Sequence, residues 1–366
     1  MKLSVIILNY NVHYFLELCL RSVEAAISKL DAEIIVIDNN SKDGSCQMVK
    51  ALFPKVKLIE NKENHGFSKG NNIGVLQAKG EYLCILNPDT VIAEDTFLKL
   101  FEFSKNKENL GIIGCKIING NGLFLPESKR NIPTVNVAFK KIFGYPKHYY
   151  ANHLSKDESG KVDILVGAFM LIKKNIFDEV CGFDEDYFMY GEDIDLSYKV
   201  LKAGYENYYF GGTSIIHYKG ESTLKDRFYA RRFFGAMQIF YEKHFKQNLL
   251  FDMFVWLGIK LAYIFRRIRK VKVKNISEYI FVSNKNNNKL ESMLSKKVIL
   301  KMELESVKPN SEIIFDANVM SYKKIIDTLE QLNKEEALTY KILPNKANFI
   351  IGSDNGFKQG EVILFE

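Results

Sequence analysis

The 366-residue sequence has only five cysteines, which are scattered along the chain and form no CxxC pair. An odd number of unclustered cysteines argues against a disulfide framework and against a zinc site. The N-terminus lacks a long apolar stretch followed by small residues, so we expect no secretory signal. These absences predict a cytoplasmic protein with free thiols. The cysteines are Cys19, Cys46, Cys84, Cys115 and Cys181.

The bulk composition is that of a folded protein. Hydrophobic residues make up 47% of the chain and aromatic residues 13%, which is enough for a sizeable core and excludes global disorder. The length allows two domains or one large one. The formal net charge of +7 favours anionic partners such as nucleotides or phospholipids, without selecting among them.

The first 90 residues alternate short, continuously apolar segments with segments of helical periodicity. This alternation predicts a mostly parallel sheet with helices on both faces. In such sheets, ligands bind beyond the carboxyl ends of the strands. Asn9, Tyr10, Asp38 and Asp89 all follow expected strands, so we expect them at one edge. The expected strands are residues 2–9, 33–37, 56–60 and 82–86, and the expected helices are residues 12–27, 45–52 and 68–78.

Two polar segments follow expected strands and precede expected helices. Residues 38–45 read DNNSKDGS; a carboxylate there can accept hydrogen bonds from a nucleobase or ribose, or the segment is a plain turn with a helix cap at Asp43 or Ser45. Residues 64–72 read NHGFSKGNN. Glycine turns and helix N-termini present N–H groups to phosphates, although a simple capped helix start explains this segment equally well.

Asp89 lies in the sequence NPDT, directly after an expected strand that Pro88 ends. A divalent ion that bridges two phosphates prefers hard oxygen ligands and needs only one or two of them from the protein. An ordinary turn is the alternative. His217 follows a second apolar segment; it is either a structural histidine or a neutral imidazole ligand that joins Asp89 at an ion.

Residues 182–196 are rich in acidic and aromatic side chains. Glu192 and Asp193 open an expected helix over residues 194–203. The helix dipole stabilises an anion at this end, so either acid could serve as a base toward a hydroxyl placed within hydrogen-bond reach. Acidic helix capping is the alternative. Further along, we expect a strand within residues 163–172 and a helix over residues 225–245, with residues 120–160 rich in loops.

Taken together, these segments resemble the family 2 glycosyltransferases with the GT-A fold, in their rhamnosyltransferase-like group. The resemblance covers about residues 1–240 and depends on the order and spacing of the motifs. The motifs are SVIILNYN (4–11), DNNSKDGS (38–45), NHGFSKGNN (64–72), LNPDT (86–90), GAFMLI (167–172), residues 182–196 and HYKGEST (217–223).

The resemblance implies a role for each site residue. Asp38, with Asn9 and Tyr10, would hold the nucleoside of the donor; Asp89 would be the metal-binding acid of the DxD element, and His217 would complete the metal site. One departure is that Asn87 replaces the first acid of DxD, so the metal has fewer charged ligands. The residues implied to line the donor are Asn64, Gly66 and Asn71. Asp193 would be the base that deprotonates the acceptor, and Glu192 would position acceptor or donor.

The implied reaction is a single displacement with inversion at the anomeric carbon, in which Mg²⁺ or Mn²⁺ neutralises the departing nucleoside diphosphate. The acceptor would be a hydroxyl of a glycan or polyprenyl-linked saccharide in cell-surface polysaccharide synthesis, and dTDP-rhamnose is one candidate donor. Two other functions stay open: a nucleotidyltransferase, and a non-catalytic sugar-nucleotide-binding or scaffold protein.

The remaining chain divides into two expected parts. Residues 249–265 are apolar nearly all round, and residues 266–274 are mostly Arg and Lys. Such a helix is about 25 Å long, short of a roughly 30 Å bilayer core, and it contains Asp252 and Lys260. We therefore weigh a helix that lies at the inner face of the cytoplasmic membrane, with the basic cluster on anionic headgroups, against internal packing. Nothing else in the sequence supports nucleic-acid binding.

Residues 275–366 predict a small, separate α/β domain. The expected strands are residues 279–282, 313–315, 340–343 and 349–351, and the expected helices are residues 289–295 and 321–333. We thus divide the chain into a catalytic domain (1–240), an apolar and basic helical segment (241–274) and an accessory domain (275–366).

Overall fold

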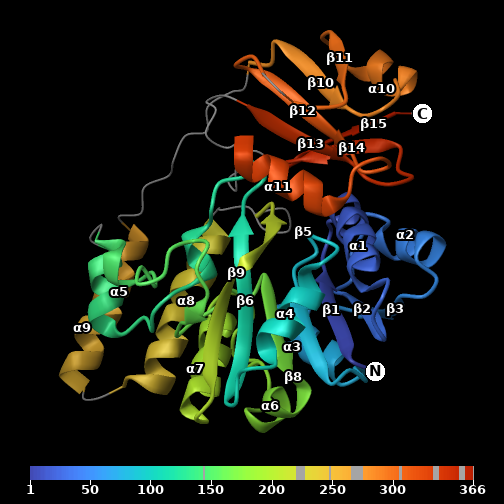
Figure 1. The fold of residues 1–366 in the computed structure, drawn as a ribbon. Coiled ribbons are helices and arrows are strands. Elements are labelled where there is room, and N and C mark those ends of the chain that lie inside the picture. The colour runs from blue at the N-terminus through green and yellow to red at the C-terminus, as the bar shows by residue number, and fades with distance from the viewer. Residues whose placement is uncertain are drawn as a thin grey trace.

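The computed structural model describes residues 1–142, 145–219, 227–246, 249–264, 275–304, 307–332, 338–353 and 359–365. Two sheets organise these residues (Figure 1). The larger has nine strands, eight of them in the order β3-β2-β1-β4-β8-β6-β9-β5, with β7 paired to β9. The smaller has six strands in the order β11-β10-β12-β13-β14-β15.

The N-terminal half of the large sheet is the expected parallel one. β1 pairs with β2 and β4, and β2 pairs with β3, all in parallel. β1, β2 and β4 are apolar and almost entirely buried, because helices cover both faces. α3 begins at Gly66 and ends at Val75, slightly earlier than the pattern predicts. The elements are β1 (Leu3–Asn9), α1 (His13–Ile27), β2 (Ala32–Asp38), α2 (Ser45–Leu52), β3 (Lys57–Glu60), α3 (Gly66–Val75) and β4 (Tyr82–Leu86).

The other half of the sheet is mixed. β8 runs antiparallel to β4 and β6, β6 is parallel to β9, and the short β5 is antiparallel to β9. This last pairing places Thr90 opposite His217. The elements are β5 (Thr90–Ile92), α4 (Thr96–Ser104), β6 (Leu110–Ile118), η1 (Pro126–Ser128), η2 (Pro146–His148), β7 (Gly160–Lys161), β8 (Phe169–Lys173), α6 (Lys174–Glu179), α7 (Glu192–Lys202) and β9 (Glu206–His217).

Three helices cover the side of the sheet next to α7. They are α5 (Val135–Ile142), α8 (Arg227–His244) and α9 (Leu249–Ile264), and α9 packs against the other two (Figure 1). The expectation that residues 120–160 are loops therefore misses α5. The expected strand at residues 163–172 begins only at Phe169, because Ile164 forms an isolated bridge to Arg130 instead.

Among the described helices, α9 included, none combines the length and the apolar character needed to cross a membrane. The basic run at residues 266–274 lies outside the described residues, as do residues 220–223 of the HYKGEST motif.

The C-terminal unit contains every strand and helix that we expect there, and its sheet has two further strands, β11 and β15. β11 and β15 are edge strands whose residues are half-buried or exposed, so their apolar pattern is weak. The α/β fold class predicted from the sequence, a domain with helices on both faces of a large sheet followed by a small α/β unit, is confirmed. The elements are β10 (Glu278–Val282), α10 (Asn288–Met293), β11 (Val298–Lys301), β12 (Ser311–Asp316), α11 (Tyr322–Leu332), β13 (Thr339–Leu343), β14 (Phe349–Gly352) and β15 (Glu361–Leu364).

The two sheets share one hydrophobic cluster, formed by α1, β5, the end of β9, α11 and the C-terminal strands. Within it, the ring centroids of Tyr14 and Phe349 are 4.9 Å apart. At its rim, Lys116 of β6 forms an ion pair with Glu330 of α11 at 2.9 Å. The C-terminal unit therefore packs directly on the large sheet. The division at residues 240 and 274 stays a prediction.

Candidate active site

The ends of β1 and β2 hold a buried polar pair. Asn9 and Asp38 are opposite each other in the parallel register, and Asn9 Nδ2 donates to Asp38 Oδ1 at 2.8 Å. Asp38 Oδ2 accepts from the backbone N–H of Ser41 at 2.8 Å. The start of α2 is held separately, because Asp43 accepts from both the N–H and the hydroxyl of Ser45. Asp38 is therefore not needed as a helix cap, and Tyr10, half-buried, follows at the same edge.

The turn before α3 approaches the segment before α7 very closely. Gly66 has a φ of +77°, and a Cβ there would lie 2.3 Å from the carbonyl oxygen of Phe188. The N–H of Phe67 donates to that oxygen at 2.6 Å. Asn64 Oδ1 accepts from the N–H of Gly66 at 2.9 Å. Only glycine fits this position, because any side chain would clash with the backbone of Phe188. The expected donor-binding turn therefore needs a glycine here for a close contact and not for flexibility.

Two buried amide oxygens near this edge have no hydrogen-bond partner among the described residues. They are Oδ1 of Asn9 and Oδ1 of Asn71, and the Nδ2 atom of Asn71 is occupied by the carbonyl of Phe67 at 2.9 Å. A buried acceptor that no donor reaches is costly in a folded chain. Both atoms are suitable acceptors for the hydroxyl or N–H groups of a ligand.

Asp89 and His217, far apart in the chain, meet at the β5–β9 pair. Asp89 Oδ1 lies 3.3 Å from His217 Nε2, and both residues are buried. The Nδ2 atom of Asn87 is also 3.3 Å from His217 Nε2. Among the described residues, no group of three or more acidic, histidine or cysteine side chains could hold a metal ion. An ion at Asp89 and His217 would therefore take one carboxylate and one imidazole from the protein and the rest of its shell from phosphate and water.

Asp193 forms a buried ion pair that the sequence does not reveal. Its Oδ2 atom accepts from Nη2 of Arg130 at 2.6 Å and from the N–H of Gly167 at 3.0 Å. Its Oδ1 atom accepts from the N–H of Ile194 at 2.8 Å, at the start of α7. Arg130 is a lone arginine within the loop-rich stretch, and only its position in space marks it as part of the site.

Glu192 is next to this ion pair but lacks one of its own. It is 6% exposed, and its Oε2 atom has no hydrogen-bond partner among the described residues. Burial, together with the charge of Asp193, raises the pKa of Glu192 to about 8. Asp193 is thus ion-paired, whereas the neighbouring Glu192 is buried without a partner for Oε2 among the described residues. Such a difference is usual when one carboxyl acts as a base and the other keeps its proton.

Backbone contacts link the two halves of the site. The N–H of Asn87 donates to the carbonyl of Ala168 at 3.1 Å, and the preceding N–H, that of Gly167, donates to Asp193. These two hydrogen bonds connect the segment after β4, which carries Asp89, to the start of α7, which carries Glu192 and Asp193. A cavity of about 530 Å³ opens at Glu192 and Asp193 and at Phe67. Asp89, His217 and the other predicted donor residues are not among its lining.

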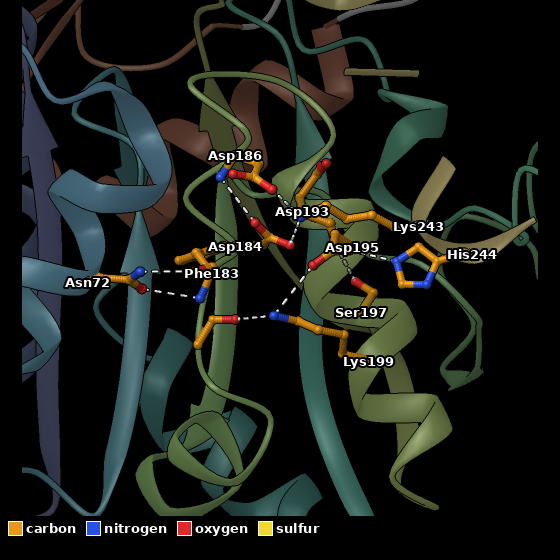
Figure 2. A network of polar contacts seen from close by, with 11 residues as sticks. Asn72, Phe183, Asp184, Asp186, Asp193, Asp195, Ser197, Lys199, Lys243 and His244 are labelled. Atoms are coloured by element: carbon orange, nitrogen blue, oxygen red, sulfur yellow. Dashed lines mark hydrogen bonds and ion pairs between the residues drawn. The ribbon is translucent and has the colours of Figure 1, made fainter. Parts of the chain in front are cut away.

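The remaining acids of residues 182–196 have structural roles (Figure 2). Lys243 of α8 binds both Asp184 and Asp186, and Nε2 of His244 lies 2.7 Å from Oδ1 of Asp195. On the other side, Asn72 of α3 donates to the carbonyl of Phe183 at 2.8 Å. These contacts attach α7 and the segment before it to α8 and α3. Several acids of residues 182–196 therefore serve to anchor this segment.

An edge that gathers amide, carboxylate and imidazole groups beside a cavity with two carboxyls is typical of enzymes that transfer a group from a nucleotide to a hydroxyl. Residues 4–181 match the model of the family described as Glycosyl transferase family 2. This match covers 178 of the 366 residues. It confirms the resemblance to the family 2 glycosyltransferases in this part of the chain and identifies the protein as a glycosyltransferase.

Curated relatives agree with the rhamnosyltransferase-like resemblance. N-acetylglucosaminyl-diphospho-decaprenol L-rhamnosyltransferase from Mycobacterium tuberculosis is 26% identical over 242 residues, which cover 61% of this chain and 78% of the relative. The hexosyltransferase Agl10 of low-salt glycan biosynthesis, from Haloferax volcanii, is 28% identical over 58% of this chain and 65% of its own. Rhamnosyltransferase WbbL from Escherichia coli is 30% identical over 42% of this chain and 61% of its own.

Among solved structures, the mannosyltransferase PcManGT from Pyrobaculum calidifontis in complex with GDP-Man and Mn²⁺ is 16% identical. The similarity covers 71% of this chain and 73% of that one, with a TM-score of 0.49. It bears on neither the substrate nor the metal of this chain.

Proposed function

We propose that this glycosyltransferase moves a sugar from a nucleoside-diphosphate sugar to a hydroxyl of a glycan or lipid-linked saccharide, with inversion at the anomeric carbon. The observation that carries the proposal is two buried pairs on segments joined by backbone hydrogen bonds through Gly167 and Ala168: Asp89 with His217, and Glu192 with Asp193 at the start of α7. The first pair suits a leaving diphosphate and the second suits an incoming hydroxyl.

On the donor side, Asn9, Tyr10 and Asp38 hold the nucleoside, and the turn at Asn64 and Gly66 together with Asn71 lines the sugar diphosphate. The unpartnered amide oxygens of Asn9 and Asn71 support this assignment. Asp89 and His217 hold Mg²⁺ or Mn²⁺. When bound, the ion neutralises the charge that develops on the departing diphosphate.

On the acceptor side, Asp193 takes the proton of the hydroxyl. Arg130 and the N–H of Gly167 hold one of its oxygens in a fixed direction. The hydroxyl oxygen bonds to the anomeric carbon while the bond from that carbon to the diphosphate oxygen breaks. The electron pair leaves with the nucleoside diphosphate, and the proton goes to Asp193.

Glu192 has a different task. Because its pKa is raised to about 8, it is mostly protonated at neutral pH and can donate a hydrogen bond from its free Oε2. A protonated carboxyl next to the base positions a sugar hydroxyl without competing for the reacting proton. We therefore assign Glu192 to positioning and Asp193 to catalysis.

The relatives' names suggest the setting. Two of them are rhamnosyltransferases, and one name specifies a decaprenol-linked acceptor, so dTDP-rhamnose is a candidate donor and a polyprenyl-linked saccharide a candidate acceptor. The setting is synthesis of a cell-envelope polysaccharide or glycan at the inner face of the cytoplasmic membrane. Residues 249–274 would make the peripheral contact.

A panel of nucleotide sugars tests the proposal. Each is incubated with the protein and Mn²⁺, and slow donor hydrolysis and protection against thermal unfolding are measured. We expect one donor to be hydrolysed and to protect, and both effects to need the metal. Protection without hydrolysis or transfer would favour a binding or scaffold protein. Turnover of nucleoside triphosphates in place of nucleotide sugars would favour a nucleotidyltransferase.

A further inference from the structure

The cavity beside Glu192 and Asp193 extends well beyond the two carboxyls. Its far wall comes from α8 and α9 and is apolar, with aromatic rings prominent. Its volume of about 530 Å³ falls in the range of pockets that enclose small-molecule ligands. A saccharide would find few hydrogen-bond partners on this wall. The wall residues that matter here are Phe233, Phe234, Met237, Phe240, Val255 and Ile259.

Two cationic side chains, Lys141 and Arg130, also line the cavity, together with the acids Glu127, Glu192 and Asp193. Nζ of Lys141 lies 3.2 Å from the ring centroid of Tyr149, and burial lowers the pKa of Lys141, an effect that Tyr149 partly offsets. Arg130 is 6% exposed, and its Nε atom has no hydrogen-bond partner among the described residues. Arg130 is paired with Asp193, whereas the half-buried Lys141 has no carboxylate ion-pair partner among the described residues. An anionic ligand would relieve this imbalance.

α9 presents apolar side chains in two directions. Val255 is 5% exposed and Ile259 is half-buried, and both face the cavity. Met253 and Leu257 are 55% and 46% exposed, and both lie outside the cavity lining. A chain too long for the cavity could therefore continue along an apolar surface on the same helix.

We propose that this cavity binds the diphosphate and the first isoprenoid units of a prenyl-diphosphate-linked acceptor. The inference rests on the proposed function, since it places the acceptor's sugar hydroxyl at Asp193. Arg130 and Lys141 face the diphosphate, and the wall formed by α8 and α9 holds the chain. A cavity that combines cationic side chains with a largely apolar wall matches a ligand in which an anionic head is joined directly to a hydrocarbon chain.

Geranyl diphosphate is the probe that tests the site. Its binding is measured by calorimetry without metal, beside inorganic diphosphate and geraniol, which each carry half of its chemistry. We expect geranyl diphosphate to bind at least tenfold more tightly than either. Equal affinity for geranyl diphosphate and inorganic diphosphate would overturn the proposal.

Two substitutions on α9 form a matched pair. Ile259→Gln changes the cavity wall, and Leu257→Gln makes the same kind of change outside the cavity. We expect Ile259→Gln to weaken geranyl diphosphate binding about tenfold and Leu257→Gln to leave it unchanged, with both variants keeping the wild-type melting temperature within a few degrees. Lys141→Met should weaken the binding of geranyl diphosphate and leave the binding of geraniol unchanged. Equal losses in the two α9 variants would refute the assigned wall.

Turnover separates an acceptor site from a mere inhibitor site. With the donor that the panel identifies, a saccharide on geranyl diphosphate should have a KM at least tenfold below that of the same saccharide on methyl diphosphate. The difference should disappear in Ile259→Gln. Donor hydrolysis without any acceptor should be equal in the wild type and in Leu257→Gln, whose substitution lies outside the cavity. Normal hydrolysis with no chain preference would end this inference and leave the proposed function standing, whereas no hydrolysis of any donor would count against the function itself.

Discussion

Arg130 donates from Nη2 to Oδ2 of Asp193 across 2.6 Å, although 63 residues separate the two in the chain. Both side chains are buried, at 8% and 12% exposure. The contact ties a loop residue to the first turn of α7, and it holds one carboxylate oxygen in a fixed direction beside the cavity. The proposed base is thus preorganised by a partner that lies outside every motif of the family resemblance.

Replacing Asp193 with Asn should abolish most sugar transfer while leaving donor binding intact. General-base catalysis contributes about 10²- to 10⁴-fold to rate, and we expect a loss in that range with unchanged protection by the nucleotide sugar. The matched Glu192→Gln variant should lose less, because Gln can still donate a hydrogen bond. Wild-type transfer by Asp193→Asn would show that the base lies elsewhere.

Removing Arg130 should destabilise the protein. Arg130→Met leaves the Asp193 carboxylate buried without a cation, and breaking a buried pair in this way costs about 3–5 kcal/mol. The double variant Arg130→Met/Asp193→Asn should recover part of that loss, since no uncompensated charge is left. Urea unfolding of the four forms measures both effects. If the double variant is no more stable than Arg130→Met, the pair does not interact as the distance implies.

Stability should depend on pH through Glu192. Its pKa is raised to about 8, above the usual 4.5, so the folded state holds a proton that the unfolded state releases more easily. The stabilisation from this proton is complete below about pH 4.5 and is lost as pH rises toward 8. Glu192→Gln should lack this component. Unfolding free energies at pH 4.5, 6 and 8 for both forms check the difference; parallel curves would contradict the raised pKa.

His217→Ala and Asp89→Asn should each weaken metal binding in the presence of a nucleoside diphosphate. Each removes one of two protein ligands, so we expect the Mn²⁺ concentration for half-maximal donor hydrolysis to rise at least tenfold. Titration of Mn²⁺ by paramagnetic resonance, with and without the nucleotide, measures affinity directly. His153→Ala, an exposed histidine bonded to the carbonyl of Lys161, is the control. Unchanged Mn²⁺ affinity in both site variants would move the ion to other ligands.

Trp256 can report on membrane contact because it is the only tryptophan in the chain. It is 43% exposed on α9, near Met253 and Leu257. If this surface enters a bilayer interface, anionic vesicles should shift its emission to the blue, and high salt should weaken the effect. Met253→Glu/Leu257→Glu should abolish both the shift and flotation with the vesicles. Equal flotation of the variant and the wild type would assign the surface another role.

Much of this architecture can be predicted from local patterns in the sequence. Continuous apolar segments such as residues 33–37 and 82–86 predict buried parallel strands, because only a sheet covered on both faces hides every side chain. Polar residues that follow such strands, such as Asp38 and Asp89, are then predicted to lie at the same edge of the sheet. The parallel half of the large sheet follows from this reasoning, whereas the GT-A class depends on the order and spacing of the motifs. The edge strands β11 and β15 are not predicted, because half-exposed strands have no distinctive apolar pattern.

Other features depend on contacts between distant segments, which no local pattern encodes. Arg130 reaches Asp193 only because an isolated bridge joins it to Ile164, and the raised pKa of Glu192 comes from burial that α8 and its neighbours complete. The cavity likewise exists only where α5, α8 and α9 close over the strand edge. The sequence by itself determined which residues can perform the chemistry. The tertiary structure decided which carboxyl is paired with an arginine, which is buried without a partner and has a raised pKa, and what surface an acceptor meets, because ion pairing and desolvation depend on distance in space and not on separation along the chain.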